Sequence, residues 1–308
     1  MFKQEIDFLG KRKIALIISS ILIICSIASL AINGLKLGID FTGGTLVEVG
    51  YKQSADLSVL RKALSETGFA DATVQHFGTT KDVLIRIKPR EGVSNAELST
   101  QVLSAVNKHS AEPADLRRVE FVGPQVGDEL AEDGGLALLY SMFGILIYVA
   151  WRFEHKFSLG SVAALVHDVI ITLGFFSVVQ MEFDLTVLAA VLAVIGYSLN
   201  DTIVVYDRIR ENFRNLRKDS SENIMNISLN QTLSRTLVTS ITTALVLIAL
   251  ALLGGEIIHN FAIALLIGVG IGTYSSIYVA SPIVLALGIT KEDLMVPVKE
   301  GEEIDEMP

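Results

Sequence analysis

Six long apolar runs constrain the fold of this chain more than any other feature of its sequence. A run of about twenty apolar residues is long enough to cross a hydrocarbon core of roughly 30 Å as a helix. The chain has 308 residues, of which 51% are hydrophobic and 19% charged, which is too apolar for a soluble protein of this size. We therefore predict an α-helical membrane protein with six transmembrane helices, at residues 14–33, 134–151, 157–179, 185–206, 236–253 and 261–287.

The distribution of Lys and Arg predicts how these spans are oriented. Basic residues gather before the first run, between the second and third, and between the fourth and fifth, whereas the short loops 180–184 and 254–260 contain none. Because cytoplasmic loops carry an excess of Lys and Arg, both termini are predicted to be cytoplasmic. The first run is long and is not followed by a small-residue cleavage site, so we expect it to be retained as an anchor.

The same pattern divides the chain into segments with different expected environments. Ile209, Phe213 and Leu216 share one helical face among arginines, which predicts an amphipathic helix that lies on the cytoplasmic membrane surface and contacts anionic lipids. The acidic carboxy-terminal segment is predicted to be a solvated, disordered tail. The predicted segments are the amino terminus with the first span (1–33), an extracytoplasmic domain (34–133), spans two to four (134–206), the amphipathic loop (207–235), spans five and six (236–290) and the tail (291–308).

The polar segment 34–133 is predicted to fold as one small extracytoplasmic domain. Residues 35–51 combine β-branched residues with a Gly pair and predict a strand, a turn and a strand, while 72–77, 82–88 and 116–124 predict further strands. Two amphipathic helices are expected at 56–69 and 95–109, with inward-facing Leu57, Leu60 and Leu64 in the first and Leu98, Val102, Ala105 and Val106 in the second. The order βαββαβ predicts a ferredoxin-like α+β sandwich with both helices on one face of an antiparallel sheet.

Asp40, Gly43 and Gly44 lie at the start of this domain, just after the first span. One interpretation is a contact site where the chain leaves the membrane. The other is a tight turn that needs positive φ at glycine, with Asp40 as a solvated turn residue. The sequence leaves both interpretations open.

Asn200 and Asp201 interrupt the fourth apolar run. A central Asp costs roughly 2.5 to 3.5 kcal/mol of insertion free energy, and ionisable groups inside membranes almost always face the bundle interior or a water-filled path. Arg235 begins the fifth run, and Thr239 follows it on the same helical face. We predict that Asp201 alternates between a state paired with Arg235 and an unpaired state, which makes it a proton switch. The alternative is a static ion pair between helices, which gains little stability over apolar side chains.

Asp168 poses the same question in the middle of the third run. We expect it either to take part in the proton relay or to link helices. Its neighbour His167 is expected to be a hydrogen-bonded histidine at a helix interface rather than a relay residue. An intramembrane aspartyl protease built on Asp168 and Asp201 would need both acids at a common depth, and the Gly-x-Gly-Asp sequence of that class is missing. No catalytic residue, cofactor or metal site is predicted, so we expect no enzyme activity.

The sixth run contains small residues at every fourth position. Gly268, Gly272 and Ser276 form a face that allows another helix to approach closely. This face predicts either tight packing within the bundle or a sliding interface with a partner.

Five stretches of the sequence together closely resemble the SecF family, the smaller subunits of the bacterial SecDF complex. They are "GIDFTGGTLVEV", "RFEHKFSLGSVAALVHDVIITLGFF", "FDLTVLAAVLAVIGYSLNDTIVVYDRIREN", "TLSRTLVTS" and "IGVGIGTYSSIYVASP". The resemblance implies half of a resistance-nodulation-division (RND) type bundle, completed by a SecD-like subunit into a twelve-span unit in the bacterial cytoplasmic (inner) membrane.

The resemblance also implies a function and a proton path. Members of the family work beside the SecYEG channel and use the proton-motive force to assist translocation of a preprotein. An Asp of the fourth span and an Arg at the head of the fifth are linked to proton passage in the family, and they match Asp201 and Arg235 here. The expected partners are therefore the SecD-like subunit, SecYEG, the preprotein, protons and membrane lipids, but no nucleic acid. The alternative is a proton-coupled half-transporter of RND type that exports lipid or small molecules.

Overall fold

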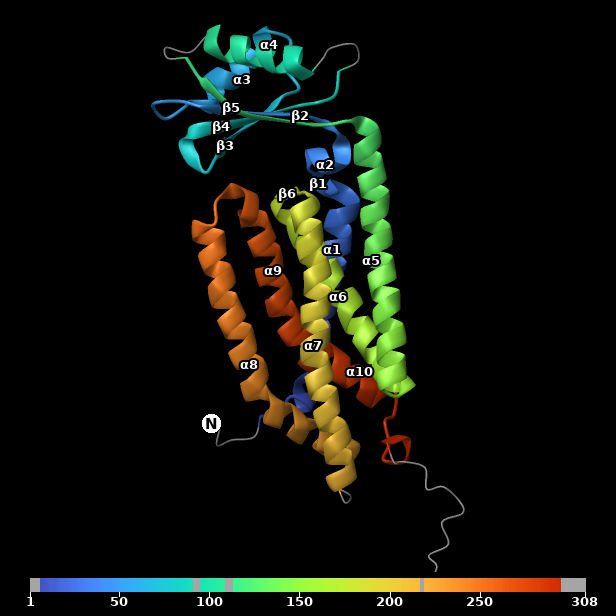
Figure 1. The fold of residues 1–308 in the computed structure, drawn as a ribbon. Coiled ribbons are helices and arrows are strands. Elements are labelled where there is room, and N and C mark those ends of the chain that lie inside the picture. Colours follow the sequence, from blue (N-terminus) through green and yellow to red (C-terminus); the bar gives the residue numbers. More distant parts are fainter. Residues whose placement is uncertain (1–5, 91–94, 109–112, 217–218, 295–308) are drawn as a thin grey trace, which may run out of the picture.

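The computed structural model describes residues 6–90, 95–108, 113–216 and 219–294. Long helices run roughly side by side, and a small lobe lies at one end of them, opposite the end where the amino-terminal residues of α1 lie (Figure 1). Within the described residues, six helices are long and apolar enough to cross a membrane, as the sequence predicts. They are α1 (Arg12–Asn33) with a preceding 3-10 turn (Leu9–Lys11), α5 (Pro124–Arg152), α6 (His155–Val179), α7 (Leu185–Asn215), α8 (Ser221–Leu253), and α9 (Glu256–Ser275), which continues through a π-helical turn (Ser276–Ala280) into α10 (Ser281–Ala286).

The interior of the bundle is formed by α6, α7 and α9, and α1, α5 and α8 carry most of the exposed apolar side chains. Small residues allow α1 to pack closely against α6. A Cβ atom at Gly174 of α6 would lie 2.7 Å from the Cα of Ser26. Further along the same contact, the hydroxyl groups of Ser29 and Ser177 are 2.8 Å apart. The packing face of α1 is therefore made of its small and polar residues, while its large apolar residues point outward.

The lobe contains a four-stranded antiparallel sheet covered by two helices on one face (Figure 1). Its elements are β2 (Gly44–Gly50), α3 (Leu57–Glu66), β3 (Thr73–Phe77), β4 (Thr79–Ile87), α4 (Asn95–Lys108) and β5 (Asp115–Val122), and the strand order is β3-β4-β2-β5. The element order βαββαβ is the one that the sequence predicts. Six of the seven apolar positions expected to face inward from the helices are buried, and Leu57 is partly buried.

The stretch 35–51 has a strand at each end, as the sequence predicts, but only the second strand belongs to the lobe sheet. β1 (Lys36–Leu37) does not join the lobe sheet but pairs in parallel with β6 (Glu182–Phe183), in the loop between α6 and α7. The turn is a single helical turn, α2 (Ile39–Thr42). The backbone N–H of Gly38 donates to the carbonyl of Phe183 at 2.8 Å. This pairing joins the start of the lobe to the loop between α6 and α7.

The boundary predicted at residue 133, between the lobe and the second span, falls inside a continuous helix. α5 begins at Pro124, and its first ten residues extend the helix beyond the predicted span. Pro at the first helical position has no N–H to leave unpaired and a φ suited to the helix. The acidic residues of this stretch are exposed or half-buried, so the helix can continue without fully burying charge. Hydropathy alone marks only the apolar part of such a helix.

The loop 207–235 does not form a separate helix on the membrane surface. α7 continues to Asn215 and α8 begins at Ser221, so the two transmembrane helices extend beyond their predicted ends. Ile209 and Phe213 are buried against protein because the two helix ends pack against each other, which leaves no apolar face for lipid. The side chain of Asn212 joins these ends by donating to Ser228 and Gln231 at 2.8 Å each. Most of the predicted acidic tail, residues 295–308, lies outside the described residues.

Candidate functional site

Asp168 lies in the middle of α6 and is the centre of a buried polar cluster. The Asp168 and His167 side chains are only 1% and 3% exposed. The Oδ2 atom accepts hydrogen bonds from Ser198 of α7 at 2.5 Å and from Ser275 of α9 at 2.7 Å. The Oδ1 atom lies 2.8 Å from Nδ1 of His167. Asp168 is therefore hydrogen-bonded on both oxygens, and it links α6 to two other helices.

His167 extends this cluster to the first span. Its Nε2 atom lies 3.2 Å from Oγ of Ser19 in α1, and Ser19 in turn lies 3.0 Å from the hydroxyl of Tyr274 in α9. The Tyr274 hydroxyl donates to the carbonyl of Ala15 at 2.8 Å. A continuous chain of hydrogen bonds thus runs from Asp168 to the backbone of α1. Both ring nitrogens of His167 have partners at a helix interface, as the sequence predicts.

Asp201 is buried on α7, three residues after Ser198, and is 3% exposed. Its Oδ2 atom has no hydrogen-bond partner among the described residues. Arg235 is exposed on α8, close enough for its charge to act on the Asp201 carboxylate, but within the described part of the chain the two do not form an ion pair. In this structure Asp201 and Arg235 are therefore unpaired. Whether they alternate with a paired state stays a prediction.

Asn200 and Thr239, which we predict to be polar residues of a helix interface, lie on the outer surface of this chain. Asn200 is exposed, and so is Thr239. The Thr239 hydroxyl donates to backbone carbonyls of its own helix, to Arg235 at 3.0 Å and to Thr236 at 2.9 Å. Asn200, Arg235 and Thr239 are therefore exposed on the surface of this chain, where a neighbouring subunit could contact them.

Gly268 and Gly272 allow α9 to lie directly against α7. A Cβ atom at Gly268 would lie 2.0 Å from Cγ2 of Val194, and one at Gly272 would lie 3.0 Å from the Cβ of Ser198. This close approach lets Ser198 and Ser275 reach the same carboxylate oxygen of Asp168. Of the two interpretations of the small-residue face, the structure uses these glycines for packing within the bundle.

Asp40, Gly43 and Gly44 join the lobe to the membrane-spanning helices. Oδ2 of Asp40 accepts from the backbone N–H of Leu185 at 2.9 Å, at the first residue of α7. Gly43 and Gly44 have φ of 66° and 131°. A Cβ atom at Gly43 would lie 2.9 Å from the Cα of Pro124. The turn therefore has positive φ at both glycines, and Asp40 contacts the amino-terminal end of α7, whose N-cap residue is Asp184.

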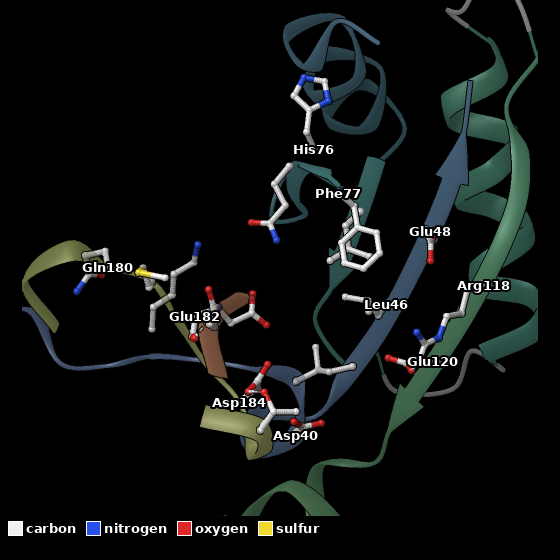
Figure 2. A pocket seen from close by; sticks show the side chains of 17 residues that line it. Asp40, Leu46, Glu48, His76, Phe77, Arg118, Glu120, Gln180, Glu182 and Asp184 are labelled. Atoms are coloured by element: carbon white, nitrogen blue, oxygen red, sulfur yellow. Dashed lines mark hydrogen bonds and ion pairs between the residues drawn. The ribbon is translucent and has the colours of Figure 1, made fainter. Parts of the chain in front are cut away.

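A cleft of about 460 Å³ lies between the uncovered face of the lobe sheet and the outer ends of the membrane helices. Its lining residues, most of them charged among those named here, come from both sides. Leu46, Glu48, Arg118 and Glu120 line it from the sheet, and Asp40, Glu182 and Asp184 line it from the opposite side (Figure 2).

Arg86 of β4 crosses between the two sides of this cleft. It donates to the carbonyl of Leu37 at 3.0 Å and pairs with Glu182. Burial lowers the pKa of Arg86, and the neighbouring carboxylates of Asp40 and Asp184 act in the opposite direction. Because a guanidinium keeps its proton under all ordinary conditions, Arg86 stays charged and fastens the lobe to the bundle.

Several residues of these clusters could not be singled out from the sequence. Ser19, Ser198, Ser275 and Tyr274 take part in the network around Asp168, and Arg86 forms the contact between lobe and bundle. Serine is common at helix interfaces, and only its recurrence in the otherwise apolar first span, at Ser19, Ser26 and Ser29, is a usable signal. Among the residues that the structure describes, no group of three or more His, Cys, Asp or Glu is placed to hold a metal ion.

We expect Asp40→Ala to loosen the amino-terminal end of α7, because it removes an acceptor from the Leu185 N–H. Loss of a side-chain acceptor at the amino terminus of a helix typically lowers stability by about 0.5–2 kcal/mol. Hydrogen exchange of the Leu185 amide should accelerate, while Asp40→Asn, which retains an acceptor oxygen, should have a smaller effect. Asp56→Ala is the matched control, since it removes the cap of α3 inside the lobe, where Asp56 accepts from the Ser58 N–H at 2.8 Å. Equal exchange at Leu185 in the wild type and Asp40→Ala would contradict this role.

The sequence of this chain is similar to those of known protein families and of individual proteins. Residues 102–290 match the family described as "Protein export membrane protein SecD/SecF, C-terminal", and residues 28–55 match the "SecD/SecF GG Motif". The chain is 54% identical to "Protein translocase subunit SecF" of Vibrio alginolyticus, with 99% of this chain and 98% of that protein covered. It is 49% identical to the protein of the same name from Pseudomonas aeruginosa, with 98% of each chain covered.

Solved structures of similar fold include the crystal structure of SecDF, a translocon-associated membrane protein from Thermus thermophilus. The TM-score is 0.84 and the sequence identity 35%, and the match covers 93% of this chain and 39% of that one. A crystal structure of SecDF in a super-membrane-facing form matches with a TM-score of 0.70 and 36% identity over the same shares of the two chains. This chain thus spans about two fifths of the length of the SecDF chains that it matches.

Proposed function

The chain belongs to the SecD/SecF family of protein export membrane proteins, and on that premise we propose that it uses the proton-motive force to assist Sec-dependent protein translocation. It is a membrane protein and a translocase subunit of the SecF type, the role stated by the names of its relatives. The similarity to SecDF supports a SecD partner in the complex. In this role the chain moves polypeptide and needs no catalytic chemistry of its own.

The architecture that goes with this function is half of an RND-type bundle with a ferredoxin-like lobe. The lobe has the element order βαββαβ, an antiparallel sheet and both helices on one face, which supports the ferredoxin-like assignment. The match to about two fifths of the SecDF chain supports a half-unit that a SecD-like subunit completes. The basic loops support an orientation with both termini in the cytoplasm of a bacterial cell and the lobe outside the cytoplasmic membrane.

The observation that carries the proton-driven function is the Asp201 carboxylate. It is buried within a membrane-spanning helix, one of its oxygens has no hydrogen-bond partner among the described residues, and Arg235 is close without pairing. An ionisable residue inside a membrane-spanning helix raises the free energy of insertion, and the few that occur are usually functional. In our proposal, Asp201 binds a proton while unpaired and releases it when it meets Arg235. Asp168 is a second acid of the same relay, and the exposed Asn200 and Thr239 face the SecD-like partner.

The remaining proposed partners follow from the same role. The SecYEG channel supplies the preprotein, protons supply the driving force, and membrane lipids surround the exposed apolar faces of α1, α5 and α8. Asp40 and its glycines connect the lobe to α7, the helix that also carries Asp201. Movement of α7 on protonation would therefore be passed to the lobe outside the membrane. The proposed partners do not include a nucleic acid.

One observation favours the alternative of a lipid or small-molecule half-transporter. A groove of about 680 Å³ extends from Arg12 and Lys13 to Ser19 and His167, and most of its other lining residues are apolar. A pull-down of the protein in mild detergent separates the two functions. Recovery of a homologous six-span partner together with the SecYEG channel is the result expected for a translocation subunit. Recovery of a homo-oligomer without either would support the transporter.

Arg235→Lys should reduce export driven by the proton gradient by about tenfold without abolishing it. Lysine keeps the positive charge but lacks the planar fork with which Arg binds a carboxylate. The rate is measured in membrane vesicles with an imposed proton gradient, and Arg214→Lys, at an exposed position near the end of α7, is the matched control. Export at the wild-type rate in Arg235→Lys would mean that Arg235 acts only as a point charge.

A further inference from the structure

Resting on the proposed proton-driven function, we propose that His167 and Asp168 bind one proton between them as a single unit, so that His167 is a further proton-carrying residue of the relay. Ser19 acts as the positioning residue that fixes the orientation of the imidazole ring. The relay that the sequence predicts uses acids and an arginine, and His167 has no part in it beyond packing. The proposal depends on the direction of each hydrogen bond in the cluster.

The direction of the bonds follows from Tyr274, which has a single hydroxyl proton. The Tyr274 hydroxyl donates this proton to the carbonyl of Ala15 at 2.8 Å, so it can only accept from Ser19, 3.0 Å away. Ser19 uses its own proton in that bond, and its oxygen must therefore accept from Nε2 of His167 at 3.2 Å. The Nε2 atom of His167 consequently carries a hydrogen.

The bond between Nδ1 of His167 and Oδ1 of Asp168, 2.8 Å long, must then contain one further proton. If Asp168 is ionised, Nδ1 also carries a hydrogen and the ring is an imidazolium. If Asp168 is protonated on Oδ1, it donates to the bare Nδ1 of a neutral ring. Passage between these two states breaks an N–H bond and forms an O–H bond, and the pair has no net charge in either state.

States with one proton fewer or one more are unfavourable in this surrounding. With one fewer, the lone pair of Nδ1 would face a buried carboxylate, and with one more, two hydrogen-bond donors would face each other. Both states also leave a net charge in a buried site, which is strongly unfavourable because the charge loses its hydration. The pair therefore exchanges its proton only when the two side chains separate.

Among the described residues, the groups that contact the pair from neighbouring helices through hydrogen bonds or ring stacking are neutral. They are Ser19 from α1, Ser198 from α7, and Ser275 and Tyr274 from α9, whose ring stacks on the imidazole with centroids 6.1 Å apart. Ser198 and Ser275 both donate to Oδ2, which favours the carboxylate form and so places the shared proton on His167. The charged residues that line the groove beside the ring are Arg12, Lys13 and Glu222, at its other end.

Separation of the pair is coupled to helix movement by the same hydrogen bonds. His167 links α6 to α1, whereas Asp168 links α6 to α7 and α9. Because Ser198 lies three residues before Asp201 on α7, a shift that releases Asp168 also moves the helix that carries the other acid. The groove of about 680 Å³ that reaches His167 provides the side from which the ring can exchange its proton.

A spectroscopic test uses the complete complex with its SecD-type partner, reconstituted in lipid with nitrogen-15 histidine. The His167 signals are identified by their loss in His167→Asn. We expect the wild-type ring to keep a protonated Nε2 and a strongly hydrogen-bonded Nδ1, and Asp168→Asn to change the Nδ1 signal. A His167 ring with the same signals in the wild type and in Asp168→Asn would overturn the proposal.

A functional test asks whether the proton on His167 is used. His167→Asn keeps a side-chain amide that can donate to Asp168 but cannot exchange a proton, so export driven by the proton gradient should fall at least about tenfold. Ser19→Ala removes the positioning bond together with the bond to Tyr274, leaves the proton-carrying groups in place, and should reduce export by about two- to threefold. His155→Asn, at the exposed start of α6, is the matched control for replacing a histidine and should export normally.

Two outcomes separate the failure of this inference from the failure of the proposed function. Normal export in an assembled His167→Asn complex, with export abolished in Asp201→Asn, would overturn the role of His167 and leave the proton-driven function intact. Normal export in Asp201→Asn as well would remove the proton-driven function. If His167→Asn does not assemble, the wild-type and Asp168→Asn spectra together with export by Ser19→Ala decide the question, and unchanged export in Ser19→Ala would count against it.

Discussion

Asp201→Asn should reduce export to the rate measured without a proton gradient. The substitution keeps the size and polarity of the side chain but removes the group that binds and releases a proton. The variant should insert into the membrane as well as the wild type, because the free energy of placing a neutral amide in a membrane is lower than that of placing a carboxylate there. The carboxylate is 3% exposed and its Oδ2 atom makes no hydrogen bond to any described residue, so few contacts in the bundle depend on its charge.

The measurement compares export in vesicles with and without an imposed proton gradient, after checking that the variant assembles with its SecD-type partner. Asp207→Asn is the matched control, because it makes the same substitution on the same helix at an exposed carboxylate that pairs with Arg152 at 3.1 Å. Surface pairs of this kind contribute little to stability. Asp207→Asn should therefore export like the wild type. Gradient-dependent export in an assembled Asp201→Asn complex would contradict the hypothesis that Asp201 is a proton switch.

Gly44→Ala should cause the largest loss of stability among the variants considered. Gly44 has a φ of 131°, which residues with a Cβ atom rarely adopt. A Cβ atom at this position would also lie 2.6 Å from the backbone carbonyl oxygen of Ile87. That oxygen belongs to the strand paired with β2 and cannot move without breaking the ladder. The two effects together are expected to cost more than about 3 kcal/mol.

Gly68→Ala separates backbone strain from the steric conflict. Gly68 also has a positive φ, of 89°, but a Cβ atom there would meet nothing within 4 Å. This control should cost only about 1 kcal/mol. Hydrogen exchange of the β2 and β4 amides in the assembled complex measures the difference. Similar protection in both alanine variants would show that the contact with Ile87 is unimportant.

The helical spans and the order of elements in the lobe were predictable because they depend on local patterns. Each apolar run is long enough to cross a membrane whatever surrounds it. Alternating and helical spacing of apolar residues likewise predicts strands and amphipathic helices, and Leu60, Leu64, Leu98 and Val102 are buried as this spacing requires. The position of Asp201 inside an apolar run was enough to mark it as a candidate functional residue.

Helix ends and the partners of the polar residues were not predictable in the same way. α5, α7 and α8 extend past their apolar runs, because a helix continues through polar residues when they are exposed or packed against another helix. The pairing of β1 with β6 joins the start of the lobe to the loop between the third and fourth spans, and the bond between His167 and Ser19 joins residues 148 apart. No pattern within a short stretch of sequence encodes such contacts.

The sequence by itself determined that this chain has six apolar segments long enough to cross a membrane, one mixed α+β lobe and acidic residues inside two of the apolar segments. The reason is that the cost of placing polar groups in hydrocarbon depends on each residue and its immediate neighbours. Only the tertiary structure decided that Asp40 accepts a hydrogen bond from the first residue of the helix that carries Asp201, and that Arg235 does not pair with Asp201. It also decided that His167 and Asp168 share a hydrogen bond within a chain that reaches α1. Those arrangements depend on how the helices pack together, because hydrogen bonds form only between groups that packing brings within reach.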